Sequence, residues 1–122
     1  MELLNYIYGA RRYRTVVAYG TFFEDFLKEQ EQKVQVKILQ ILRVIEEVEI
    51  LPTNHLRHIS GTDGLYEIRV TFGKRIFRVF CCFDAQKLVV LLSGFQKKTR
   101  KTPRKEIERA LLIMREYYKD KE

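Results

Sequence analysis

Apolar and polar residues alternate with two different periods along this chain, and the change of period separates predicted helices from predicted strands. Between Gly20 and Pro52, apolar side chains recur every three or four positions in two stretches, which is the spacing of one helix face. After Gly64, apolar and polar residues alternate one by one, as is typical of β-strands. The pattern therefore predicts two helices followed by a sheet.

Local signals place the ends of these elements. The β-branched and aromatic run at 13–19 predicts a first strand. Thr21 and Glu24 have the spacing of a capping box and predict the start of the first helix. Pro52 ends the second helix, and the polar stretch 53–64 predicts a loop. The apolar sides of the two helices are Phe22, Phe23, Phe26 and Leu27, and Val34, Ile38, Ile41, Leu42, Ile45 and Val48.

Two alternating segments on either side of Gly73 and Lys74 predict a β-hairpin. A two-residue turn with glycine at its first position favours type II′ and would pair Phe72 with Arg75. This register brings the apolar side chains of both strands onto one face, as a sheet with a buried face requires. The hairpin therefore predicts a polar face on its other side.

The rest of the chain completes the fold. The continuous apolar run 88–95 predicts a central strand covered on both faces. Thr102 as N-cap and Pro103 as first helical residue predict a final helix. We expect an α+β fold, a small antiparallel-rich sheet of about four strands flanked by two N-terminal helices and one C-terminal helix. Residues 1–122 are expected to form one domain, with 1–12 as a candidate N-terminal extension.

Charge then narrows the classes of partner. The 122 residues carry a net charge of +7, and residues 57–109 alone hold thirteen basic and five acidic side chains, a net +8. Such a field favours a nucleic acid or an acidic protein as partner, with an anionic membrane as a third option. No apolar run approaches the roughly 18 residues of a membrane span, and the N-terminal basic residues follow the apolar stretch, the reverse of a secretory signal. We expect a cytoplasmic protein without a membrane partner.

Neither a metal nor a cofactor is expected. The two cysteines, Cys81 and Cys82, are adjacent in a predicted strand and point to opposite faces, so they are interpreted as reduced apolar side chains. Together with the distant His55 and His58, they fit no common zinc-ligand spacing.

The predicted polar face of the hairpin carries the candidate chemistry. The register places Arg69 opposite Arg78, two like charges whose repulsion a bound anion would reverse. Lys97 and Lys98 lie where the central strand ends, so we expect a phosphate pocket at this point. Further RNA-contacting residues are expected among Lys74, Arg75, Arg100 and Lys101. Tyr66 and Phe80 are the nearest aromatic residues that could stack on a base, although Tyr66 lies on the apolar face.

Such a pocket could cleave RNA by attack of the ribose 2′-OH on the adjacent phosphorus. The two arginines would stabilise the developing negative charge. Glu67, on the same face as Arg69, is the candidate base, with Lys97 or Lys98 as alternative base or acid. His58 lies in the preceding loop and could reach the pocket only if that loop folds over it. Binding without catalysis, to a nucleic acid or to an acidic partner, is the alternative interpretation of the same residues.

Three segments then point to a family: LYEIRV at 65–70, FRVF at 77–80 and GFQKKTRKTP at 94–103. With the order of elements over about residues 13–118, they resemble the RelE/ParE superfamily of type II toxins, in particular its HigB-like, phage-derived branch. The resemblance implies a cytoplasmic toxin that cleaves mRNA in the ribosomal A site. It also implies inhibition by a cognate helix-turn-helix, HigA-like antitoxin.

The resemblance also implies residue roles. The family's basic positions fall on Arg69, on Arg78 and on Lys97 or Lys98. RelE has a second lysine where this chain has Glu67, and Tyr117 and Tyr118 are the candidates for its C-terminal tyrosine. Relatives of the ParE type inhibit DNA gyrase and lack these catalytic basic residues. The presence of Arg69, Arg78 and the two lysines therefore favours the ribonuclease. A gyrase inhibitor and a non-catalytic basic binding module remain the alternatives.

Overall fold

The computed structural model describes residues 12–50 and 53–122. The candidate extension at 1–12 lies outside the described residues except for its last position, and so does Pro52. The chain forms, in order, β1 (Thr15–Ala18), α2 (Phe22–Lys28), α3 (Gln32–Glu47), β2 (Leu56–His58), β3 (Tyr66–Phe72), β4 (Arg75–Asp84), β5 (Leu88–Lys97) and α4 (Arg104–Asp120).

The five strands form one mixed sheet in the order β1-β5-β4-β3-β2. β1 is parallel to β5, and the other neighbours are antiparallel. This confirms the predicted α+β fold with three helices, but the sheet has one strand more than expected. The additional strand, β2, lies within the stretch that was predicted to be only a loop.

The predicted hairpin register is confirmed. Phe72 pairs with Arg75 and Arg69 with Arg78. Gly73 has a φ of 60°, whereas Lys74 is not among the residues with positive φ. A type I′ turn would need positive φ at both positions, so these values fit the predicted type II′ turn.

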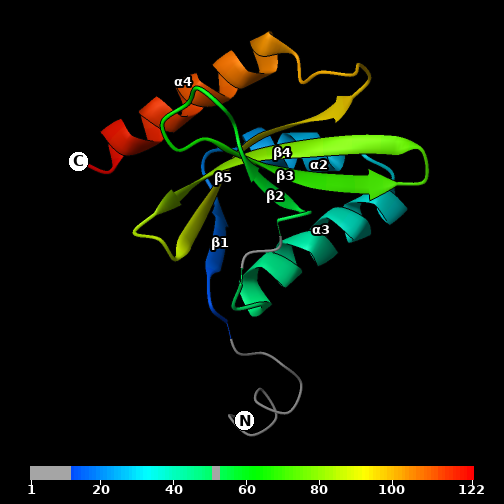
Figure 1. Cartoon of the computed structure of the whole chain (residues 1–122), viewed down its shortest axis with the longest axis horizontal. Helices are drawn as coiled ribbons and strands as arrows, with labels where there is room; N and C mark the ends of the chain where they lie inside the picture. Colours follow the sequence, from blue (N-terminus) through cyan, green and yellow to red (C-terminus); the bar gives the residue numbers. More distant parts are fainter. Residues whose placement is uncertain (1–11, 51–52) are drawn as a thin grey trace, which may run out of the picture.

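Helices cover both faces of the sheet (Figure 1). α2 and α3 pack on one face through a stripe of apolar residues that includes Phe26, Ile38 and Ile45. α4 packs on the other face through Ala110, Ile113 and Met114. β4 and β5 are buried on both sides, which confirms the interpretation of 88–95 as a covered strand. We call the two sides of the sheet the α3 face and the α4 face.

Two predicted helix caps are wrong in detail. Thr21 precedes α2 but makes no side-chain capping bond, and its hydroxyl lies 3.2 Å from Asp25 Oδ2. α4 begins at Arg104 with Pro103 as its N-cap. The Thr102 hydroxyl is free for another partner because the helix begins one residue later than predicted. That partner is Glu67, as described below.

The two cysteines are unpaired and buried, one on each face of β4. Burial raises the pKa of both thiols, so they stay protonated and act as apolar side chains. Within residues 12–50 and 53–122, no helix is long and apolar enough to cross a membrane.

Candidate functional site

Five charged side chains from four neighbouring strands meet on the α4 face, beyond the N-terminus of α4. They follow from the register: Arg57 pairs with Glu67, Arg69 with Arg78, and Ile76 with Lys97, so all five project from the same side of the sheet. We call these residues, Arg57, Glu67, Arg69, Arg78 and Lys97, the basic cluster. With four cations and one anion, its formal charge is +3.

Glu67 lies at the centre of this cluster and has no exposed surface. Its Oε1 accepts a hydrogen bond from Arg57 Nη2 at 3.0 Å, and its Oε2 accepts one from Thr102 Oγ1 at 3.4 Å. Oε2 also lies 3.7 Å from Arg78 Nε. One buried carboxylate therefore joins β2, β4 and the loop before α4.

Arg78 is the most buried cation of the cluster, with 4% of its surface exposed. Its Nη1 donates to the Phe77 carbonyl at 3.0 Å, but its buried Nε has no hydrogen-bond partner within the described part of the chain. The 3.7 Å separation from Glu67 is too long for a hydrogen bond. Burial lowers the pKa of Arg78, and the Glu67 carboxylate opposes that shift. An incoming anion would give this donor the partner that it lacks.

Arg78 is therefore buried, although it lies on the predicted polar face of the hairpin, where an exposed side chain would be expected. The strand pattern correctly placed Arg78 on the same side of the hairpin as Arg69. In the sheet, Arg78 also pairs with Phe95 of β5. That side is nonetheless covered, because α4 and the segment before it pack on the same face.

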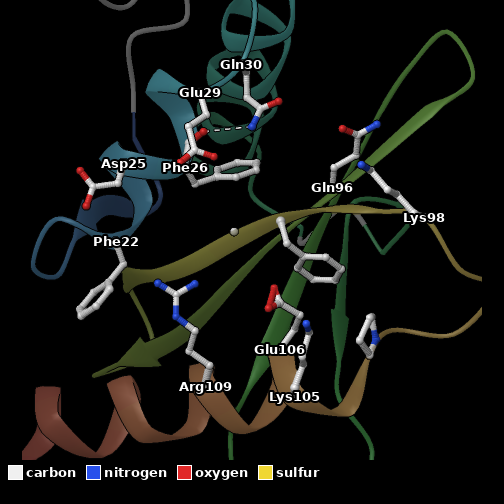
Figure 2. A pocket seen from close by; sticks show the side chains of 13 residues that line it. Phe22, Asp25, Phe26, Glu29, Gln30, Gln96, Lys98, Lys105, Glu106 and Arg109 are labelled. Carbon is white, nitrogen blue, oxygen red and sulfur yellow. Dashed lines mark hydrogen bonds between the residues drawn. The ribbon is translucent and has the colours of Figure 1, made fainter.

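Lys97 belongs to the cluster, whereas its neighbour Lys98 does not. Burial lowers the pKa of Lys97, and repulsion from Arg78, Arg69 and Arg57 adds to the shift while Glu67 opposes it. Lys98 is exposed and lines a different cleft, between α2 and α4 (Figure 2).

Two hollows adjoin the basic cluster. The first has a volume of about 330 Å³ and is lined by Lys37, Ile41, Asn54, His55, Arg69, Thr71, Ile76 and Arg78. The second has a volume of about 440 Å³ and is lined by Arg57, His58, Ile59, Ser60, Lys97, Arg100, Lys101, Thr102 and Ile107. Neither has a carboxylate in its lining, so both suit a polyanion.

The sequence interpretation missed two residues of this site, His55 and Arg57. Both belong to the stretch read as a loop, where Leu56 is the one buried apolar residue that marks β2. His55 Nδ1 lies 3.4 Å from the Arg69 carbonyl oxygen. A carbonyl only accepts, so the tautomer of the neutral ring that fits this contact has its proton on Nδ1 and its lone pair on Nε2.

Of the four further residues predicted to contact RNA, two lie apart from the cluster and two lie beside it. Arg75 lies on the α3 face, where it forms an ion pair with Glu31 at 2.5 Å, and Lys74 is exposed in the turn. Arg100 and Lys101 line the second hollow.

The aromatic candidates also lie apart. Phe80 is fully buried and stacks on Phe95 with 5.7 Å between ring centroids, so the idea that it stacks on a base is wrong. Tyr66 packs edge-on against Phe83 on the α3 face. Tyr117 and Tyr118 contact Asp84 and the Phe83 carbonyl, at the far end of β4. That end is six residues from Arg78, or roughly 20 Å at about 3.3 Å per residue.

No group of three or more His, Cys, Asp or Glu side chains that could hold a metal ion occurs among residues 12–50 and 53–122. The chemistry that this site offers is that of guanidinium, ammonium and imidazole groups around a phosphate-sized space.

The family of the chain follows from a comparison with protein-family models. The family described as "Phage derived protein Gp49-like (DUF891)" matches residues 25–115, which are 91 of the 122 residues and include the whole basic cluster. A search of curated proteins finds no match to the chain. The chain belongs to this Gp49-like family of phage-derived proteins, which is a toxin family of RelE-like type, and membership of a toxin family implies an antitoxin partner.

Proposed function

We propose that this protein is a ribosome-dependent mRNA endonuclease of a type II toxin-antitoxin system, inhibited by a helix-turn-helix antitoxin. The observation that carries the proposal is the buried guanidinium of Arg78, whose Nε lacks a hydrogen-bond partner in the described chain, among three further cations. A desolvated and incompletely paired cation destabilises the free protein, and a phosphodiester would satisfy it. The family match supports the assignment as a toxin, and the geometry around Arg78 supports the binding of a phosphodiester.

The proposed reaction is a transesterification within the RNA strand. The ribose 2′ oxygen forms a bond to the adjacent phosphorus, and the bond from phosphorus to the 5′ oxygen breaks. The products are a 2′,3′-cyclic phosphate and a 5′-hydroxyl, and the step consumes no water. Arg69 and Arg78 are placed to stabilise the negative charge on the pentacoordinate phosphorus, because both line the first hollow.

His55 and Lys97 are the proposed proton-transfer groups. The His55 Nε2 lone pair can accept the proton of the 2′-OH, since the ring shares the first hollow with Arg69 and Arg78. Lys97 can donate a proton to the leaving 5′ oxygen, and its lowered pKa makes it a stronger acid than an ordinary lysine. Glu67, the base expected from the sequence, lacks contact with solvent and is engaged by Arg57 and Thr102.

The second hollow would hold phosphates beside the cleaved bond. Arg57, Arg100 and Lys101 line it together with Lys97, so an RNA strand that enters there passes the proposed acid before it reaches Arg78. Lys98, which the sequence offered with Lys97 as a candidate base or acid, takes no catalytic part in this proposal.

Substitution of Lys97 tests the proposal. Lys97→Ala is expected to slow cleavage by about 10² to 10⁴-fold, the usual contribution of a general acid or base. Lys97→Arg keeps the charge but transfers protons poorly, so it should restore RNA association without restoring cleavage. Lys98→Ala, the matched neighbour, should cleave like the original protein. The measurement is the mapping of transcript 5′ ends after induction in growing cells, with ribosome association followed by sedimentation.

Intact translated mRNAs in growth-arrested cells would refute the endonuclease. Altered plasmid supercoiling in those cells would favour the ParE-like gyrase inhibitor instead. Continued growth on induction would favour the non-catalytic binding module.

A further inference from the structure

A cleft between α2 and α4 exposes one edge of the sheet (Figure 2), and no residue of the basic cluster lines it. Its volume is about 580 Å³, and its floor is the last part of β5, from Gly94 to Gln96. β1 pairs with β5 only from Leu88 to Leu91, so this part of the edge has no neighbouring strand among residues 12–50 and 53–122.

The ladder determines which backbone groups point into the cleft. Phe72 and Arg75 flank a two-residue turn, so odd-numbered residues of β4 direct their N–H and C=O toward β3 and even-numbered ones toward β5. Arg78 and Ile76 therefore bond to Phe95 and Lys97. Gly94 and Gln96 consequently direct their own N–H and C=O outward.

The outward groups of Gly94 and Gln96 have no partner within the described chain. The pairing of β4 with β5 shifts register between Val79 and Cys81. Beyond this irregularity the same reasoning turns Leu91 outward, and its carbonyl does accept a hydrogen bond, from Tyr19 N at 3.0 Å. Two free donors and two free acceptors, two residues apart, are the template on which an extended peptide forms a further strand.

The two edges of the sheet differ in how well they are protected against pairing with a strand of another chain. β2, at the opposite edge, is three residues long and exposes Arg57 and His58, which discourages pairing with another chain. At the β5 edge, Gly94 has no side chain to block an approach, and a Cβ atom there would lie 2.5 Å from the Phe26 ring. The packing of α2 thus requires the glycine that also leaves this edge open.

The walls of the cleft carry opposite charges. Asp25 of α2 and Glu29, the residue that caps its C-terminus, form the acidic wall, and Lys105 and Arg109 project from α4 together with Glu106 (Figure 2). Arg109 lies over the Phe22 ring at 5.7 Å, and it makes no ion pair within the described residues. A strand in this cleft would alternate its side chains between the walls, so complementarity calls for basic or amide residues toward α2 and acidic residues toward α4.

We propose that an extended segment of the antitoxin binds in this cleft as an added strand, hydrogen-bonded to Gly94 and Gln96. The proposal rests on the toxin-antitoxin pairing of the proposed function but not on RNA cleavage. Because Gln96 directly precedes Lys97, the added strand would lie beside the strand that carries the proposed acid.

Amide hydrogen exchange tests the proposal on the unaltered full chain. The probe is the protein encoded by the adjacent reading frame, added to the purified toxin. The amides of Gly94 and Gln96 are expected to exchange readily in the free protein and at least about tenfold more slowly in the complex. The amides of Phe95 and Lys97 already bond to β4 and serve as internal controls.

Two substitutions at Gln96 separate backbone from side chain. Gln96→Pro removes the outward N–H without removing a bond to β4, and it should weaken binding by about tenfold or more. Gln96→Ala keeps that N–H and should bind like the original protein. Arg109→Glu should weaken binding as well, because it reverses the charge of the α4 wall.

Three results would overturn the inference: no binding of the neighbouring protein, binding without slower exchange at Gly94 and Gln96, or full binding by a folded Gln96→Pro variant. Slower exchange on concentrating the toxin alone would assign the edge to a second copy instead, and would also overturn it. Should Gln96→Pro fail to fold, the exchange measurement on the unaltered chain still decides. Intact transcripts would refute the endonuclease hypothesis. They would not affect these measurements, which follow the binding of the neighbouring protein and not RNA cleavage.

Discussion

The environment of Glu67 in the folded chain differs from the one that its sequence position suggests. A carboxylate on the polar face of a hairpin is a reasonable candidate base, but here it is fully buried and shared by Arg57, Arg78 and Thr102. Charges that leave water need close partners, and Glu67 is the single negative charge among four positive ones. Its contacts hold the guanidinium groups of Arg57 and Arg78 in place.

The effect of Glu67→Gln on stability tests this role. The amide keeps the shape but leaves Arg78 buried without an opposite charge, so the free energy of unfolding should fall by about 3 kcal/mol. The double variant Glu67→Gln, Arg78→Met removes the unpaired charge and should recover part of that loss. Urea titration of the single and double variants measures both values. Equal stability of Glu67→Gln and the original protein would contradict a buried, charge-bearing Glu67.

Part of the site could be predicted residue by residue. The turn at Gly73 fixes the register, and the register alone places Arg69 opposite Arg78. Burial of Arg78 could not be predicted, because it depends on α4, which packs on this face from the far end of the chain. Local alternation assigns a side chain to a face but does not reveal what covers that face.

At the scale of elements, long periodic segments were predictable and short ones were not. α3 follows its apolar spacing, and all of its buried residues belong to the predicted stripe. β2 has only three residues, of which Leu56 alone is buried, so no alternation could distinguish it from a loop. Its pairing with β3 is a tertiary effect, and it is this pairing that brings Arg57 into the site.

α4 is fastened to the sheet at both ends. Thr102, just before it, bonds to Glu67, and near its C-terminus Tyr117 and Lys121 reach Asp84 at 2.5 and 2.6 Å. These contacts lower the pKa of the Asp84 carboxyl, with the Lys121 hydrogen bond as the largest cause. The helix that covers the candidate site is therefore attached in part by an acid-sensitive contact.

The loss of stability caused by Asp84→Asn should therefore depend on pH. The pKa of Asp84 is lower in the folded chain, so its stabilisation is present above the ordinary aspartate range and is lost as the pH falls through the folded pKa. Asp84→Asn should be less stable than the original protein at neutral pH, and the two should converge in acid. Unfolding titrations across this pH range measure the difference. A gap that is equal at both ends of the range would exclude the ion pair as its cause.

At the scale of the whole molecule, the positive charge is concentrated rather than spread. Residues 57–109 carry a net +8, and six of their thirteen basic side chains line the two hollows: Arg57, Arg69, Arg78, Lys97, Arg100 and Lys101. Each phosphate neutralised by a basic side chain releases a condensed counterion, so binding to RNA weakens with salt in proportion to the number of contacts.

Arg100→Gln tests whether the second hollow binds RNA phosphates. The variant should bind single-stranded RNA more weakly and with a salt slope that is smaller by about 0.7, the value for one lost contact to a single strand. Arg75→Gln, whose side chain lies on the opposite face with Glu31, is the matched control and should keep the slope. Titrations over a range of salt concentrations give both slopes, and identical slopes for the two variants would remove the second hollow from the RNA path.

The parallel pairing of β1 with β5 has a consequence for the order of folding. β2 to β5 are joined by short connections and pair with sequence neighbours, whereas Thr15 pairs with Leu88 across most of the chain. Closing so long a loop is slow compared with forming hairpins. In pulse-labelled exchange, the Tyr19 amide, which bonds to Leu91, should therefore become protected after the amides of β3 and β4. On this order, a newly made chain assembles the strands of its basic cluster before its first strand has joined the sheet.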